Sequence, residues 1–229
     1  TRILFRKRDD NQVIVHSLLY PGEQDAFSIN NEITHGDSQW GNYIRAVAFV
    51  FKRQGHKLCG VDLLIDSNVP QGSGLSSSAA LEVAVGGVFN DLCQLNLSGE
   101  MIALLGQQAE NDFMDCQCGI MDQLVSANGK KGYALLIDCQ SLATEAVAIP
   151  EDLSIVIVNS NYPRKLVDSE YNQRRIDCEQ AAIKMSVTSL RDATIEKLTA
   201  AHSIMSVNEY KRARHVITEN SRVIKATKA

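Results

Sequence analysis

The chain has 229 residues, of which 45% are hydrophobic and 22% are charged, and its formal net charge is −4. This composition is sufficient for a buried core and one or two globular domains. The weak negative charge provides no broad basic surface, which argues against nucleic acid or an anionic membrane as the main partner. Small-molecule chemistry is therefore the expected class of function.

The cysteines predict neither disulfides nor a zinc site. A chain of this size needs no disulfide to fold, so a reducing cytoplasm is the expected compartment for its six cysteines. Cys116 and Cys118 form a C-x-C pair, but no second Cys or His pair lies at the spacing of a structural zinc site. The chain has no apolar run of the roughly 20 residues that span a bilayer, so we expect no membrane partner.

Strand and helix patterns alternate along the chain, which predicts a mixed α and β fold. A β-rich opening precedes a helix that runs from Trp40 to Gly55, with Ser38 as its predicted N-cap. The helix after residue 76 is apolar nearly all round and is therefore expected to be central. The predicted strands are residues 2–6, 12–18, 26–29, 61–66, 133–137 and 154–159, and the later predicted helices are 76–95, 101–114, 119–127, 169–185 and 207–225.

The segment P-Q-G-S-G-L-S-S-S-A-A, residues 70–80, predicts an anion site at the start of a helix. Gly72 and Gly74 allow unusual backbone dihedrals and close approach of a ligand, and the positive end of the following helix favours phosphate. The alternative is a flexible turn whose serines only cap the helix. Leu75 stands where a Walker A loop would carry lysine, so this is not that motif.

Two acidic residues are candidates for chemistry near this loop. Asp122 lies in the first turn of a short predicted helix, where the helix dipole favours an ionised carboxylate. Glu110 borders the apolar stripe of the preceding helix. From the residues alone, a dipole-serving aspartate and a solvated glutamate are the simpler interpretations.

The string from Pro70 to Ala80 resembles the GHMP small-molecule kinases, whose second motif has the form P-x-x-x-G-L-S-S-S-A. The galactokinase branch of that family is the closer resemblance, carried by residues 118–124 (C-G-I-M-D-Q-L), 136–139 (L-I-D-C) and 169–172 (S-E-Y-N). The resemblance implies an α+β fold. It further implies an N-terminal domain of the ribosomal protein S5 domain 2 type at residues 1–150 and part of a ferredoxin-like domain at residues 151–229.

The resemblance implies galactose, ATP and Mg²⁺ as ligands and phosphorylation of the galactose C1 hydroxyl as the reaction. It makes Asp122 the catalytic acid/base residue, and Ser78 and Glu110 the Mg²⁺ ligands. Gly119, Asp122 and Tyr171 are the implied sugar contacts. The implied ATP-binding residues are Gly72, Ser73, Gly74, Leu75, Ser76, Ser77 and Ser78.

The chain departs from the family pattern at both ends. It lacks the N-terminal signature G-R-x-N-L-I-G-E-H-T-D-Y and the C-terminal glycine-rich motif, so we expect the chain by itself to be inactive and its full-length parent to be active. None of the five histidines lies in a matching motif. Two alternatives stay open: a kinase for another small substrate, and a galactokinase-like sensor that binds ATP and galactose without catalysis. The sequence does not define the oligomeric state, for which a monomer is the default expectation.

Overall fold

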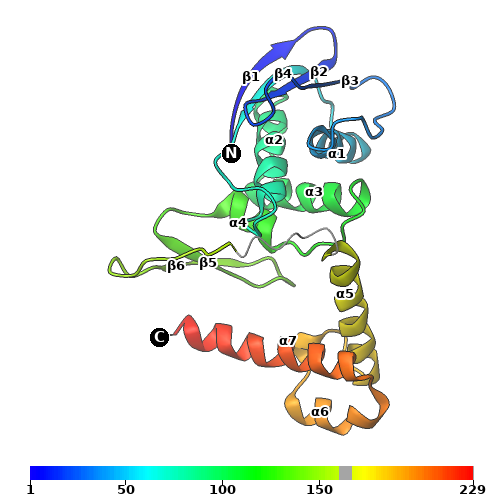
Figure 1. The fold of residues 1–229 in the computed structure, drawn as a ribbon, viewed down its shortest axis with the longest axis vertical. Helices are drawn as coiled ribbons and strands as arrows, with labels where there is room; N and C mark the ends of the chain where they lie inside the picture. Colours follow the sequence, from blue (N-terminus) through cyan, green and yellow to red (C-terminus); the bar gives the residue numbers. More distant parts are fainter. Residues whose placement is uncertain (160–166, 229) are drawn as a thin grey trace. The chain divides into compact units, whose positions relative to one another are not determined.

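The computed structural model describes residues 1–159 and 167–228, and it describes only the backbone of residues 167–171. The chain divides into two compact units, Thr1–Tyr162 and Pro163–Ala229. The mixed α+β fold predicted from the sequence is confirmed (Figure 1). The domain boundary at residue 150 stays a prediction.

The first unit contains the β-rich opening and the helices that cover it. Most predicted elements are present, with ends that differ from the prediction by a few residues. In chain order the elements are β1 (Arg2–Arg8), β2 (Gln12–Ser17), β3 (Gln24–Ser28), α1 (Gly41–Arg53), β4 (Gly60–Asp66), α2 (Ser77–Leu92), α3 (Gly99–Asp112), α4 (Met121–Asn128), β5 (Tyr133–Ile137) and β6 (Thr144–Ala148).

Four strands form a mixed sheet in the order β1-β4-β2-β3. Strand β4 pairs antiparallel with β1 and parallel with β2, where Val13 lies opposite Val61. Alternation of side chains puts Val13, Val61 and Leu63 on the covered face, while Leu4 on the opposite face is 73% exposed. The sheet therefore has one buried face, which the helices pack against.

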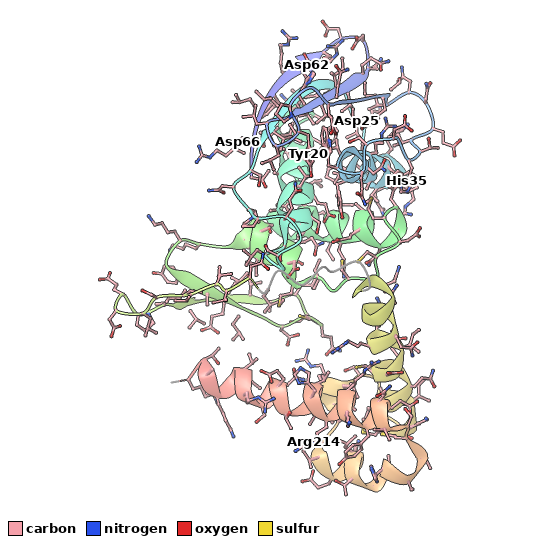
Figure 2. All side chains as sticks on the ribbon, in the orientation of Figure 1. Tyr20, Asp25, His35, Asp62, Asp66 and Arg214 are labelled. Atoms are coloured by element: carbon pink, nitrogen blue, oxygen red, sulfur yellow. The ribbon has the colours of Figure 1, made fainter. Side chains whose placement is uncertain are left out.

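Helices α1, α2 and α3 complete the core beneath the sheet (Figure 1). Helix α2 contacts α1, α3, α4 and β1, which confirms its predicted central place. Helix α1 begins at Gly41 rather than directly after Ser38, although the Ser38 hydroxyl accepts a hydrogen bond from the Gly41 N–H at 3.1 Å. The carboxylate of Asp25 in β3, which is labelled in Figure 2, binds the Arg45 guanidinium of α1 through two hydrogen bonds of 2.8 and 2.9 Å. This buried, two-point ion pair fixes α1 against the edge of the sheet.

Helices α2 and α3 approach each other closely at Gly86. A Cβ atom at this position would lie 2.8 Å from Cγ2 of Ile102, whereas a Cβ at Gly87 would meet no atom within 4 Å. We therefore expect Gly86→Ala to lower the free energy of unfolding by about 1–3 kcal/mol through overpacking. Gly87→Ala is the matched control, and it should raise that free energy by about 0.5–1 kcal/mol because alanine favours the helix. Urea unfolding of both variants measures the difference, and equal effects would contradict the close approach.

Strands β5 and β6 form a separate antiparallel pair, in which Tyr133 lies opposite Ala148. Strand β6 is absent from the predicted elements. The strand predicted at residues 154–159 is wrong, because the structure assigns no strand there. Its apolar residues are exposed, with Val156 at 80% and Val158 at 84%. Apolar β-branched sequence favours a strand, but a strand forms only where a neighbour supplies ladder hydrogen bonds.

The second unit is helical in the part that the structure describes. Its elements are α5 (Val167–Lys184), the 3₁₀ turn η1 (Leu190–Asp192), α6 (Ile195–Ala200), the 3₁₀ turn η2 (His202–Ile204) and α7 (Val207–Ala226). The two long helices were predicted, and the short α6 was not. A capping box of Ser206 and Glu209 begins α7, and Glu209 also binds Lys184 of α5 at 2.7 Å. In the described ranges, no helix combines the length and the apolarity needed to cross a bilayer.

Candidate functional site

The predicted phosphate loop connects the end of β4 to the start of α2. Gly72 and Gly74 adopt φ angles of +66° and +79°, and Ser76 adopts +58°. Such left-handed backbone is readily accessible to glycine and costly for most other residues. The Ser73 hydroxyl donates to the Pro70 carbonyl at 2.8 Å and tightens the turn. The two glycines are therefore required by the shape of the loop.

Helix α2 begins without a side-chain cap. Ser76 occupies the N-cap position, but its hydroxyl makes no capping hydrogen bond, and the first turn carries no acidic residue. The helix dipole and the first-turn N–H groups therefore meet no acidic side chain from the first turn of α2 itself. The capping interpretation of the serines is wrong for Ser76, and an anion-binding helix start fits the geometry.

An aromatic pair supports the loop from the side of the sheet. The Tyr20 hydroxyl donates to Oε1 of Gln71 at 2.5 Å, and its ring stacks on Trp40 at a centroid distance of 5.6 Å. Figure 2 labels Tyr20 in the connection between β2 and β3. The loop is therefore linked to an element distant in sequence, which limits its freedom.

Asp122 lies in the first turn of α4 with an exposed side chain, as the sequence analysis predicts. The neighbouring residues Gln123 and Leu124 are both fully buried, at 0% exposure. Leu124 packs with Ile120 and Ala103, and this contact turns the opposite face of α4 outward. The carboxylate of Asp122 is thus held at the surface by a well-packed short helix.

Ser78 and Glu110, the two predicted Mg²⁺ ligands, are brought together by the crossing of α2 and α3. The side chain of Glu110 is 9% exposed, so it is not the solvated flank residue that composition alone suggests. A hydrogen bond from Ser78 partly opposes the rise in the pKa of Glu110 that burial causes. The thiol of Cys118 also donates to Oε2 of Glu110, at 3.4 Å.

The structure adds two site residues that the sequence analysis misses, Glu82 and Gln123. Glu82 is 1% exposed on α2, and its Oε2 accepts a hydrogen bond of 3.0 Å from Nε2 of Gln123. The same nitrogen donates to Oε2 of Glu110 at 2.9 Å. A single glutamate inside the otherwise apolar run of residues 79–88 is the sequence signal that could have revealed this cluster.

The pKa values of two buried carboxyl groups in this cluster, Glu82 and Glu110, are raised. Burial raises the pKa of Glu82 well above its usual range, and the charges of Glu110 and Asp122 add to the shift. Burial also raises the pKa of Glu110, which Asp122 raises further while hydrogen bonds from Cys118, Ser78 and Gln123 oppose the shift. A cation bound beside these groups would stabilise their charged forms and so oppose both shifts.

The raised pKa of Glu82 predicts a pH-dependent cost to stability. Below the unfolded-state pKa, Glu82 is protonated in both states and costs nothing; as the pH rises toward the raised folded-state pKa, the unfolded state is favoured. Each pH unit in that window removes about 1.4 kcal/mol, roughly 3–5 °C in melting temperature. We expect the melting temperature of Glu82→Gln to exceed that of the unmodified chain by a margin that grows as the pH rises above the unfolded-state pKa. A difference that does not change with pH would contradict this.

Two further sugar contacts were predicted, Gly119 and Tyr171, and the structure describes the surroundings of Gly119. Gly119 is exposed directly before α4, and the adjacent Cys118 carbonyl accepts a hydrogen bond of 3.1 Å from Gln107. Tyr171 falls in α5, but its side chain lies outside the described residues. Its role in sugar binding stays a prediction.

The oxygen atoms in this cluster fit a hard divalent cation better than zinc. Ser78 and Glu110 offer a hydroxyl and a carboxylate, the ligand types that Mg²⁺ uses when nucleotide phosphates and water complete its shell. Oε1 of Glu82 is buried without a hydrogen-bond partner. Among the described residues, no three His, Cys, Asp or Glu side chains form a metal-ligating group by themselves. A metal held by two side chains and a nucleotide is consistent with this geometry.

Comparison with known proteins matches this region to a family. Residues 42–130 match the GHMP kinases N terminal domain, a span that includes the loop, Glu82, Glu110 and Asp122. The crystal structure of Lactococcus lactis galactokinase complexed with galactose is similar to 99% of this chain, with a TM-score of 0.92 and 35% sequence identity. This chain spans 61% of the length of that galactokinase.

A second solved structure shares the fold at low identity. A D-glycero-D-manno-heptose 1-phosphate kinase from Bacteroides thetaiotaomicron is 14% identical, with a TM-score of 0.50, over 96% of this chain and 66% of its own. The family match covers the described site, and the galactokinase similarity extends over both compact units. The resemblance seen in the glycine- and serine-rich motif is thereby confirmed, and residues 42–130 form a GHMP kinase N-terminal domain.

Proposed function

We propose that the protein is a galactokinase, which transfers the γ-phosphoryl group of ATP to the C1 hydroxyl of galactose. The observation that carries the proposal is the similarity of 99% of this chain to a galactokinase complexed with galactose. The convergence of the loop, Ser78, Glu110 and Asp122 supports it from the geometry. Galactose, ATP and Mg²⁺ are accordingly the proposed ligands.

Phosphoryl transfer requires mainly that donor and acceptor be held in line and that the charge on the moving group be neutralised. The C1 oxygen of galactose forms the new bond to the γ-phosphorus, the bond to the bridging oxygen breaks, and ADP leaves. Asp122 is positioned at the surface to orient the C1 hydroxyl and to accept its proton. Gly119, next to α4, and Tyr171 are the proposed additional sugar contacts.

The donor side of the reaction is assigned to the phosphate loop. Residues 72–78 would bind the ATP phosphates through backbone N–H groups, serine hydroxyls and the uncapped start of α2. Ser78 and Glu110 would hold Mg²⁺, whose chemistry when bound is to neutralise charge on the phosphates. A bound cation would stabilise the ionised form of the buried Glu110 carboxyl, whose pKa burial and the charge of Asp122 raise.

A substrate panel on the full-length protein tests the proposal. We expect ADP formation that depends on galactose and Mg²⁺, with galactose 1-phosphate as the product. N-acetylgalactosamine, mevalonate and homoserine are the competing acceptors, and preference for any of them would overturn the galactose assignment. Galactose and ATP binding without product would favour the sensor instead.

The location and the assembly of the protein are separate expectations. The cytoplasm is the proposed compartment because the substrate ATP is intracellular and the cysteines are free thiols. A monomer stays the default prediction. Size-exclusion chromatography of the full-length protein with light scattering tests it.

A further inference from the structure

One buried amide links three helices at the centre of the cluster. The side chain of Gln123 has no exposed surface, and its Nε2 donates to Glu82 of α2 at 3.0 Å and to Glu110 of α3 at 2.9 Å. A primary amide has two N–H donors, so each carboxylate receives one of them. The backbone of Gln123 belongs to α4, next to Asp122.

We propose that Gln123 is a positioning residue that holds the Glu110 carboxylate for the metal–nucleotide complex, with Glu82 fixing the Gln123 amide. This inference rests on the proposed function, because it assigns a task to residues beside the metal ligands. It adds two residues whose effect on the nucleotide is indirect. Neither of them is a proposed ligand.

The orientation of the Glu110 carboxylate supports this role. Gln123 and Cys118 both donate to the same oxygen atom, Oε2. The other oxygen, Oε1, accepts a hydrogen bond from neither of these two donors. A glutamate has three side-chain torsions, the last of which is broad and poorly defined. Two donors to one oxygen restrict that torsion and leave Oε1 as the atom available to a cation.

Packing alone does not account for Glu82 and Gln123. Oε1 of Glu82 and Oε1 of Gln123 are both buried without a hydrogen-bond partner. Each unpartnered polar atom disfavours the folded state, whereas apolar side chains of similar size would carry no such penalty. Glu82 and Gln123 therefore lower the stability of the core, and orientation of the Glu110 carboxylate is a role that accounts for their presence.

Two variants test the inference: the single variant Gln123→Met and the double variant that combines Glu82→Met with Gln123→Met. Titration calorimetry measures binding of Mg·ATP, and of ATP in excess chelator, to the full-length protein. We expect either change to weaken Mg·ATP binding about 10- to 100-fold and metal-free ATP binding by less than about twofold. The Mg²⁺ concentration for half-maximal activity should rise in parallel. The double variant should melt no lower than the unmodified protein, because it removes two unpartnered polar groups.

Leu124→Val is the control for a merely structural effect. Leu124 is fully buried on the same helix and packs with Ile120 rather than with the carboxylates. It should lower the melting temperature and leave the ratio of Mg·ATP to metal-free ATP affinity unchanged. The inference would be overturned if Leu124→Val lowered that affinity ratio as much as the methionine variants do, or if both methionine variants left the ratio unchanged. Either result would leave the proposed function intact. Failure of the unmodified protein to bind Mg·ATP would overturn the proposed function and this inference with it.

Discussion

Replacing Asp122 by asparagine should lower kcat for galactose phosphorylation about 10²- to 10⁴-fold, the usual contribution of a positioned general base. Asparagine keeps the size of the side chain and its surface position on α4 but cannot accept the proton of the C1 hydroxyl. The fold should be unaffected, because the Asp122 side chain is exposed and its charge only raises the pKa of Glu82 and Glu110. Mg·ATP affinity should change far less than kcat, because Asp122 is not a proposed metal ligand. Steady-state kinetics and calorimetry on the full-length protein measure both quantities.

Glu100→Gln is the matched control for this experiment. Glu100 is also an exposed carboxylate in the first turn of a helix, α3, where it interacts with the helix dipole. A role limited to the dipole predicts equally small losses of stability, about 0.3–1 kcal/mol, for Glu100→Gln and Asp122→Asn. Similar kcat values in the two variants would therefore remove Asp122 from the mechanism.

Replacing Glu110 by glutamine should lower kcat/KM about 10³-fold, because a metal centre contributes several kcal/mol of charge stabilisation in the transition state. Glutamine can still accept the hydrogen bond from Gln123, but it lacks the negative charge that a divalent cation requires. Ser78→Ala should have a smaller effect, since it removes a neutral ligand. The Mg²⁺ dependence of the rate should be shifted to higher concentration in both variants.

A double-mutant cycle separates metal binding from local packing. If Ser78 and Glu110 hold one cation, their effects on Mg·ATP affinity should be non-additive, and the coupling should vanish in excess chelator. Glu110→Gln should also stabilise the fold, since it removes a carboxyl group whose pKa burial raises. Equal weakening of metal-free ATP and Mg·ATP binding would show that Glu110 does not act through a metal.

Local sequence was sufficient to predict the elements whose patterns are strong. The alternating strands, the helices α1 to α4 and the two long helices of the second unit were found from periodicity and turn residues. Strand β6 was missed and the strand at residues 154–159 was wrong. Both errors concern pairing: a β-strand is defined by hydrogen bonds to a neighbour, and the sequence of one segment does not contain its partner.

The sequence by itself determined the glycine-rich loop before α2 and the position of Asp122, because each depends on neighbouring residues: glycines beside a helix start, and an acid in a first turn. The family resemblance paired Ser78 with Glu110, whereas only the tertiary structure decided that both glutamates are buried and that the amide of Gln123 joins Glu82 to Glu110. These side chains lie on three different helices, and they meet because α2, α3 and α4 pack together around apolar contacts. Burial raises the pKa of Glu82 and of Glu110, and burial is a property of the packed fold that no local pattern contains.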